Sequence, residues 1–86
     1  MQLVYNRSFE KAMAKLPHKI KLALKERLDL FLVNPYANIL NNHGLRGVFK
    51  HYRSINITGD YRLIYEDYDN NIVRLIDIGT HSELYN

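Results

Sequence analysis

The spacing of apolar residues changes partway along the chain, and this change limits the folds that the chain can adopt. Before residue 34, apolar residues recur every three or four positions, the period of a helix with one buried face. From residue 48 onward they alternate with polar residues, the period of a strand. The order predicts two helices and then an antiparallel meander, with the helices packed on one face of the sheet, an α+β fold.

Two stretches carry the helical spacing. The first ends at Pro17, and either Asn6 or Ser8 can cap its start because both side chains accept hydrogen bonds from free backbone N–H groups. The second is His18–Val33, and it stops before Pro35, whose ring pushes the preceding residue out of the helical region. The apolar stripes expected to face the core are Phe9, Met13 and Leu16 in the first helix and Ile20, Leu24, Leu28 and Phe31 in the second.

Four segments are predicted to be strands. They are Gln2–Tyr5 at the N-terminus and then Val48–Thr58, Tyr61–Asp67 and Ile72–Ile78. The segment Tyr36–Gly47 is rich in Asn and Gly, so we expect a connecting loop there. If Ile55 and Ile57 face the helices, then Ser54, Asn56 and Thr58 face the opposite, open side of the sheet.

Length and composition indicate a single globular domain. The chain has 86 residues, of which 47% are hydrophobic and 24% charged, so one domain spanning residues 1–86 is expected. It contains no cysteine, which excludes disulfides and thiolate metal sites and fits a reducing cytoplasm. No apolar run approaches the roughly 18 residues that a membrane-spanning helix needs. We therefore expect a soluble, cytoplasmic protein without a membrane partner.

Charge is distributed unevenly along the chain. Residues 1–53 hold ten Lys or Arg and three Asp or Glu, a net charge of +7. Residues 54–86 hold two Arg and six Asp or Glu, a net charge of −4. A basic half suggests a polyanionic partner, or an acidic protein that covers the same surface. A solvated helix face would have the same composition, so charge alone leaves both interpretations open.

Five residues that suit chemistry on RNA flank the predicted strands. They are His43 in the loop before the sheet, Asp60 and Arg62 at the start of the second strand of the meander, and His81 and Tyr85 after the last strand. Histidine can take a proton from a ribose 2′-hydroxyl or donate one to a leaving oxygen, and Asp can orient the ring or serve as the base. Arg can stabilise charge on a phosphate, and Tyr can stack on an unpaired base. These residue types suit metal-independent cleavage of a ribose phosphodiester.

Each of these residues also has a purely structural interpretation. Histidine is common in exposed loops and aspartate in turns, the arginine could pair with Glu66 or Asp77, and the tyrosine could close the core. The later histidine could cap a terminus. A metal could be held by His43 and His81, but the chain has no HExxH motif, no i,i+4 His pair and no carboxylate triad. No metal or cofactor is predicted.

Two motif blocks resemble a known family. The first block contains AsnHisGlyLeuArgGly (Asn42–Gly47), PheLysHisTyrArg (Phe49–Arg53) and GlyAspTyrArgLeuIleTyr (Gly59–Tyr65), and the second is GlyThrHisSerGluLeuTyr (Gly79–Tyr85). Together they resemble the RelE/ParE toxin superfamily, and most of all its YafQ-type mRNA interferases. The order of elements matches over nearly the whole chain. The resemblance implies a RelE-like fold, similar to small microbial ribonucleases, with an antiparallel sheet, an N-terminal strand and a two-helix hairpin on one face.

The resemblance also implies a function. It suggests a bacterial type II toxin that cuts mRNA in the ribosomal A site, without a cofactor, and that a cognate antitoxin silences. It implies that His43 or Asp60 is the base and His81 the acid, and that Arg62 contacts the scissile phosphate. The 70S ribosome and its mRNA would be partners. The implied RNA-binding residues are Lys50, Arg53, Asn56 and Tyr85.

This chain departs from the family pattern at two positions. YafQ-type toxins usually carry an acidic residue and a second His on the strand that follows TyrArg, where this chain has Ser54 and Asn56. Asn can hydrogen-bond but cannot transfer a proton. Two alternatives therefore stay open, a ParE-like toxin that inhibits DNA gyrase without nuclease chemistry and a non-catalytic interaction module of the same fold.

Overall fold

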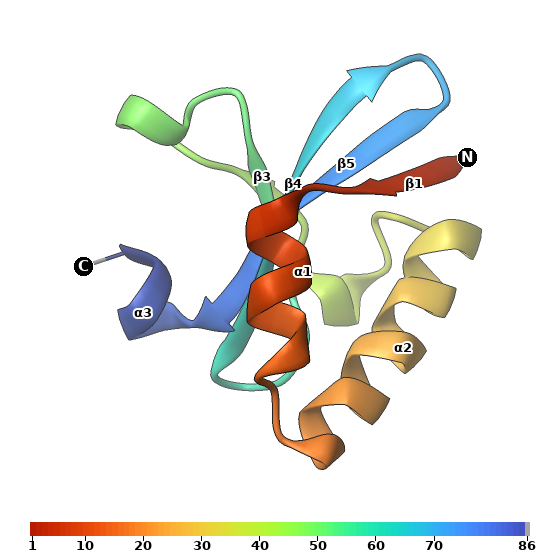
Figure 1. The fold of residues 1–86 in the computed structure, drawn as a ribbon. Helices are drawn as coiled ribbons and strands as arrows, with labels where there is room; N and C mark the ends of the chain where they lie inside the picture. The colour runs from red at the N-terminus through yellow and green to blue at the C-terminus, as the bar shows by residue number, and fades with distance from the viewer. Residues whose placement is uncertain (86) are drawn as a thin grey trace.

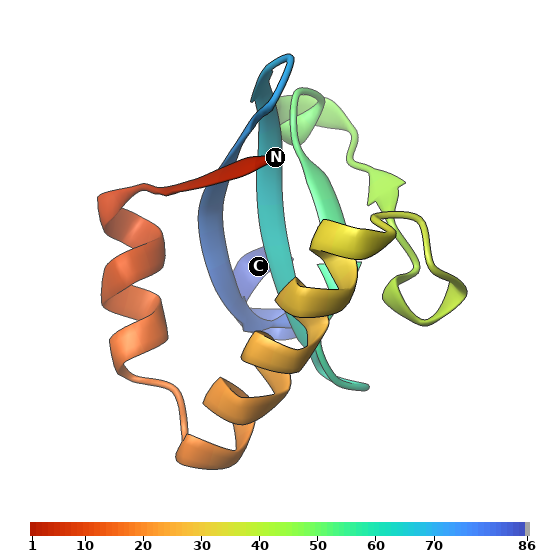
Figure 2. The ribbon, with the colours of Figure 1, turned by 90° about the vertical axis from the view of Figure 1, so that its right-hand side faces the viewer.

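Within residues 1–85, five strands form one sheet with helices on both of its sides (Figures 1 and 2). The structure is a computed structural model that describes residues 1–85. In chain order the elements are β1 (Gln2–Tyr5), α1 (Arg7–Ala14), α2 (His18–Val33), the 3₁₀ turn η1 (Asn38–Leu40), β2 (His43–Gly44), the 3₁₀ turn η2 (Gly47–Phe49), β3 (Arg53–Asn56), β4 (Tyr61–Asp69), β5 (Ile72–Thr80) and α3 (His81–Tyr85). The predicted α+β class is confirmed.

The sheet is mixed, with the order β1-β5-β4-β3-β2. The strands from β2 to β5 run antiparallel to their neighbours, as the meander predicts. In contrast, β1 lies parallel to β5. Two helices and the whole meander separate these two strands in sequence, so no hairpin dictates their relative direction.

The two longer helices cover one face of the sheet, and α3 lies on the other side (Figures 1 and 2). The Asn6 side chain caps α1, because its Oδ1 accepts a hydrogen bond of 2.8 Å from the Phe9 N–H. The second helix has the predicted bounds, His18–Val33. The first ends at Ala14, three residues before the predicted stop at Pro17, so Leu16 lies in the turn that follows it. Within residues 1–85, no helix combines the length and the apolar character that crossing a membrane requires.

The core lies between these two helices and the sheet. The alternation predicted for β3 is confirmed, since Ile55 and Ile57 are both buried in the core. The core also settles which side of β4 faces the helices, because Leu63 and Tyr65 are core residues. Its buried members are Phe9, Leu16, Leu24, Phe31, Leu40, Ile55, Ile57, Leu63, Tyr65, Val73, Leu75 and Ile78.

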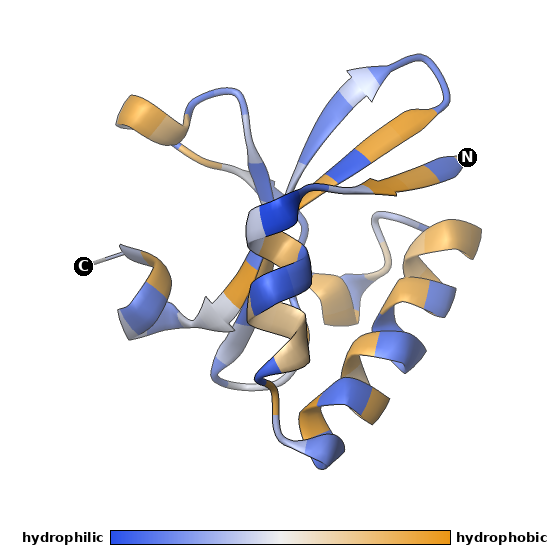
Figure 3. Ribbon diagram, viewed as in Figure 1, coloured by the Kyte–Doolittle hydropathy of each residue, from blue (hydrophilic) through white to orange (hydrophobic). Residues whose placement is uncertain are grey.

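Hydrophobic and hydrophilic bands alternate along α2 (Figure 3). Its inner side contributes Leu24 and Phe31 to the core. Apolar residues also lie on its exposed side, namely Leu22, Leu32 and Val33. A helix that is apolar beyond its core-facing stripe leaves a surface that another chain can cover.

Two of the predicted elements are wrong in detail. Val48–Tyr52 is not part of a strand, because the chain forms η2 there and β3 begins only at Arg53. The predicted loop Tyr36–Gly47 contains η1 and the two-residue strand β2. Gly47 has a φ of 64°, a left-handed conformation that Gly adopts readily and that breaks an extended run. The left-handed backbone at Gly47 therefore starts η2 and prevents β2 from continuing as an extended strand.

Candidate functional site

A polar cleft of about 370 Å³ opens at the end of the sheet where β4 begins and β5 ends. Four of the residues singled out in the sequence line it together: His43, Arg62, His81 and Tyr85. The remaining lining residues are Asn41, Leu45 and Ser54. The structure therefore brings both candidate proton-transfer histidines and the candidate phosphate-binding arginine into one site.

Strand register explains why these residues meet. His43 on β2 lies opposite Ser54 on β3, so the two side chains share a face of the sheet. Arg62 on β4 lies opposite Asn56 on one side and Gly79 on the other. His81 follows Gly79 by two residues, as the first residue of α3. His43, Arg62 and His81 therefore meet because β2, β3, β4 and β5 are neighbours in the sheet.

The hydrogen bond of His43 defines its tautomer. Its Nδ1 lies 2.8 Å from the carbonyl oxygen of Asn41. A carbonyl oxygen can only accept, so Nδ1 carries the proton and, in the neutral ring, the Nε2 lone pair is free. Asn41 itself has a φ of 46°, a left-handed conformation that Asn tolerates better than most residues. A neutral His43 is thus prepared to accept a proton at Nε2.

The neighbouring Asn42 anchors this loop to the sheet. Its Nδ2 donates hydrogen bonds of 2.8 Å to the Pro35 carbonyl and to the Tyr65 hydroxyl. Its Oδ1 accepts a 2.9 Å hydrogen bond from the Arg53 Nε. Burial raises the pKa of the Tyr65 hydroxyl, so that group stays protonated within the network. Sequence reasoning missed the structural role of Asn42, although the pair of Asn residues before His43 was a signal of special backbone geometry.

Arg62 is held by the turn that precedes β4. Its Nη1 donates to the carbonyl oxygens of Thr58, Gly59 and Tyr61 at 3.0, 3.1 and 3.2 Å. The alternative pairing of Arg62 with Glu66 or Asp77 is not formed; instead, Glu66 lies 3.7 Å from Arg74. The guanidinium is therefore fixed at one edge while it lines the cleft.

His81 and Tyr85 reach the cleft from the single turn of α3. Their rings contact each other with centroids 4.8 Å apart, and the Tyr85 ring also lies edge-on to Phe49 at 6.2 Å. The His81 N–H donates to the Asp60 carbonyl at 3.1 Å. Asp60 thus touches the site through its backbone, whereas its side chain is exposed and does not line the cleft.

The structure places the other predicted RNA-binding residues outside this cleft. Lys50 is exposed at the end of η2. Arg53 braces Asn42 and stacks on Tyr36, with 5.6 Å from its guanidinium carbon to the ring centroid. Asn56 lines a separate groove beside Arg27.

Two buried polar atoms on β3 lack a hydrogen-bond partner in the described part of the chain, Ser54 Oγ and Asn56 Oδ1. They belong to the two positions at which the chain departs from the YafQ-type pattern. No cluster of three or more His, Cys, Asp or Glu side chains suited to a metal ion occurs within residues 1–85.

Asp77, on β5, lines a separate groove with Glu83 and offers a test of electrostatics beside the polar cleft. Burial raises the pKa of its carboxyl above the ordinary value of 3.8; the Ile78 N–H, 2.8 Å from Oδ1, lowers it, and the Glu83 carboxylate raises it. Because its pKa is raised in the folded state, the protonated Asp77 carboxyl favours the folded protein. Its contribution to the free energy of unfolding is lost as the pH rises from 3.8 through the folded-state pKa. We therefore expect Asp77→Asn to raise the free energy of unfolding at pH 7.

That gain should shrink as the pH falls below 3.8, where the carboxyl is protonated in both states. Urea unfolding followed by far-UV circular dichroism at pH 7 and at pH 3 measures the difference. Asp67→Asn removes an exposed carboxylate from β4 and serves as the control. An equal gain for Asp77→Asn at both pH values would contradict the expectation.

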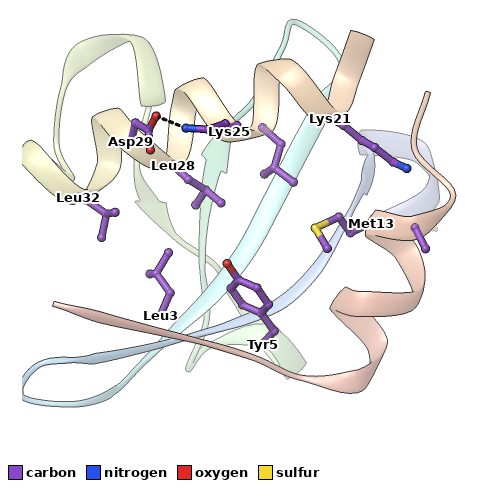
Figure 4. Close-up of a pocket in the computed structure, with 10 residues that line it drawn as sticks. Leu3, Tyr5, Met13, Lys21, Lys25, Leu28, Asp29 and Leu32 are labelled. Atoms are coloured by element: carbon purple, nitrogen blue, oxygen red, sulfur yellow. Dashed lines mark hydrogen bonds and ion pairs between the residues drawn. The ribbon is translucent and has the colours of Figure 1, made fainter. Parts of the chain in front are cut away.

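A second, apolar groove lies between β1, α1 and α2, on the helical side of the sheet (Figure 4). Its volume is about 390 Å³. The Tyr5 hydroxyl points across it toward α2, where Lys25 and Asp29 form an exposed ion pair of 2.9 Å (Figure 4). The lining residues are Leu3, Tyr5, Met13, Ala14, Lys21, Leu24, Lys25, Leu28, Asp29 and Leu32.

Known structures resemble this chain over nearly its full length. YafQ from E. coli strain BL21(DE3) is 27% identical with a TM-score of 0.82, covering 99% of this chain and 98% of that one. YafQ in the E. coli DinJ–YafQ toxin–antitoxin complex is 25% identical with a TM-score of 0.68, covering 99% and 97%. A YoeB/ParE toxin from Agrobacterium tumefaciens shares the fold, with 19% identity, a TM-score of 0.77 and coverage of 94% and 99%.

No curated protein sequence matches this chain. A family model does match, over residues 1–86, and it describes the bacterial toxin YafQ of type II toxin–antitoxin systems. The match spans both motif blocks, the helical hairpin and the residues that line the polar cleft. The chain therefore belongs to the YafQ family of bacterial type II toxin–antitoxin toxins.

Proposed function

We propose that this toxin is a ribosome-dependent endoribonuclease that cleaves mRNA in the A site and acts in the cytoplasm. The observation that carries the proposal is the polar cleft in which His43, Arg62 and His81 meet. Two histidines and an arginine provide a base, an acid and a binding group for phosphate. Membership of the YafQ family supports the same activity.

The proposed reaction is an internal transfer at phosphorus. The 2′-oxygen of the A-site nucleotide forms a bond to the adjacent phosphorus, and the Nε2 of His43 takes the 2′-hydroxyl proton. The bond from phosphorus to the 5′-oxygen of the next nucleotide breaks, and His81 donates a proton to that oxygen. Arg62 offsets the negative charge that builds up on the other phosphate oxygens. The products are a 2′,3′-cyclic phosphate and a 5′-hydroxyl, and no step requires a metal ion.

His43 is a better candidate for the base than Asp60. The hydrogen bond from His43 Nδ1 to the Asn41 carbonyl leaves Nε2 as the acceptor in the neutral ring. The Asp60 side chain is exposed and lies outside the cleft lining. We propose that Asp60 acts on the site through its carbonyl group, which accepts the His81 N–H.

RNA would reach the cleft along η2 and α3. The contact between Phe49 and Tyr85 joins these two elements, so Lys50 lies at the end of the segment that borders Tyr85. We propose that Lys50 binds a phosphate and that Tyr85 stacks on a base. The predicted contacts of Arg53 and Asn56 would lie farther from the reacting phosphate, because neither residue lines the cleft.

We also propose a cognate antitoxin that carries an acidic, amphipathic segment. E. coli YafQ forms a toxin–antitoxin complex with DinJ. In this chain, the apolar groove of Figure 4 is lined by Lys21 and by the ion pair of Lys25 with Asp29, and residues 1–53 have a net charge of +7. An acidic partner with an apolar stripe would match both features.

Mapping of mRNA 5′ ends in a translating extract tests the proposed activity. Adding the purified toxin should create new 5′-hydroxyl ends within the open reading frame of a translated mRNA. The same mRNA without a start codon serves as the control and should stay intact, because cleavage depends on an occupied A site. Co-expression with the antitoxin from a neighbouring gene should abolish both cleavage and growth arrest.

Two results would count against the nuclease. Inhibition of DNA gyrase in a supercoiling assay, with intact mRNA in the extract, would favour the ParE-like alternative. Intact mRNA together with harmless expression in the absence of any antitoxin would favour a non-catalytic module.

A further inference from the structure

Thr80 and Glu83 form reciprocal hydrogen bonds at the start of α3. The Thr80 backbone N–H donates to the Glu83 carboxylate Oε1 at 2.8 Å. The Glu83 backbone N–H donates to the Thr80 hydroxyl oxygen at 3.2 Å. This is the pattern of a capping box, in which a Thr before the helix and a Glu three residues later satisfy two free backbone donors. The two residues enclosed between them are His81 and Ser82.

A helix as short as α3 needs such support. It contains five residues, and a single turn is unstable by itself because nucleation fixes several dihedrals for one hydrogen bond. No residue of α3 belongs to the buried core. Besides the capping box, its anchors include the hydrogen bond from the His81 backbone N–H to the Asp60 carbonyl and the ring contact between Tyr85 and Phe49.

Gly79 lets the Glu83 side chain approach the end of β5 closely. A Cβ at position 79 would lie 3.2 Å from Glu83 Oε1 and 3.5 Å from its Cβ. The carboxylate therefore lies directly against the backbone where the strand passes into the helix. A larger residue at position 79 would push this carboxylate away from the Thr80 N–H.

Glu83 does not reach the reacting groups itself. It lines a different groove, with Asp77 and Lys15, on the side of α3 away from His43. The Thr80 backbone N–H, and secondarily its hydroxyl, lower the pKa of the Glu83 carboxyl, so the capping acceptor is ionised at neutral pH. A group that is bound in this way orients its neighbours and does not exchange protons with a substrate.

We propose that Thr80 and Glu83 are positioning residues that hold His81 and Tyr85 in the cleft through this capping box. The pair acts on the geometry of α3, and the catalytic meaning of that geometry rests on the proposed nuclease function. Without the carboxylate, the first turn loses the acceptor for the Thr80 N–H, and the imidazole is no longer held toward the phosphate. A displacement of about 1 Å at a reacting group lowers a rate by as much as about 100-fold.

The test compares Glu83→Ala with Glu83→Gln. Gln retains the acceptor oxygen and serves in capping boxes as Glu does, whereas Ala removes it. We expect Glu83→Ala to lower mRNA cleavage by about 10- to 100-fold and Glu83→Gln to remain within about 3-fold of the unmodified protein. Thr80→Val and Thr80→Ser should differ in the same way, because Ser retains the hydroxyl. Ser82→Ala, an exposed change in the same turn, is the matched control.

A second readout does not depend on cleavage. In NMR spectra, nuclear Overhauser contacts between the His81 and Tyr85 rings, and slow hydrogen exchange of the Thr80 amide, should be present with Gln and lost with Ala. If Glu83→Ala loses these signals but the unmodified protein cleaves no RNA, the proposed nuclease function is wrong and the positioning role stands. Full ring contacts and amide protection in Glu83→Ala would overturn the positioning role whatever the activity.

Discussion

Replacing His81 by alanine should lower the rate of ribosome-dependent mRNA cleavage by about 10²- to 10⁴-fold, the usual contribution of one general acid or base. The imidazole lines the cleft with His43 and Arg62, and alanine offers no proton to the leaving 5′-oxygen. The ring is exposed and contacts mainly Tyr85, so the fold should persist. Cleavage is measured by primer extension on a translated mRNA, and the fold by far-UV circular dichroism.

His18→Ala provides the matched control for this variant. His18 is also exposed, but it is the first residue of α2 and does not line the cleft. It should cleave at the rate of the unmodified protein. Unchanged cleavage by a folded His81→Ala variant would show that another group is the acid.

Replacing Phe31 by alanine should lower the free energy of unfolding by about 3 to 5 kcal/mol, as for other large-to-small changes at buried aromatic positions. Phe31 is 1% exposed, and its ring lies edge-on to Tyr65 with centroids 5.0 Å apart. Truncation leaves a cavity beside the strand that carries Tyr65. Domains of this size are stable by only about 5 to 15 kcal/mol, so the loss is a large fraction of the total.

Urea unfolding measures this change, and Val33→Ala serves as its control. Val33 lies two residues farther along α2 and is 85% exposed, so its truncation should cost less than about 0.5 kcal/mol. A loss below about 1 kcal/mol for Phe31→Ala would mean that the core does not close on α2 as described.

Most of the fold could be predicted from periodicity, because local spacing reports which residues face the core. The bounds of the second helix, between Pro17 and Pro35, follow from proline geometry and are confirmed, whereas the first helix ends at Ala14, before Pro17. The prediction for Val48–Tyr52 is wrong because a run of five residues is too short for its periodicity to distinguish a strand from a 3₁₀ turn. Val48 is 89% exposed, and Phe49 packs on Tyr85, a residue 36 positions away that local spacing does not reveal.

The candidate site, like the fold, could be predicted from the sequence only in part. Residue chemistry and the motif blocks identified His43, Arg62, His81 and Tyr85, and these four line one cleft. The sequence points to the carboxylate of Asp60, yet the turn exposes that group and offers the Asp60 backbone carbonyl to the His81 backbone N–H. Which part of a residue faces a site depends on the backbone path, and composition does not report that path.

By itself, the sequence determined the two long helices, the main strands, the core stripes and the residue types available for acid–base chemistry. These depend on period, proline stops and side-chain chemistry, all of which are local. Only the tertiary structure decided the parallel pairing of β1 with β5, the protonated nitrogen of His43 and the anchoring of Arg62 on three carbonyl oxygens. Each of these depends on where backbone groups lie once the sheet has formed, and spacing along the chain does not encode those distances.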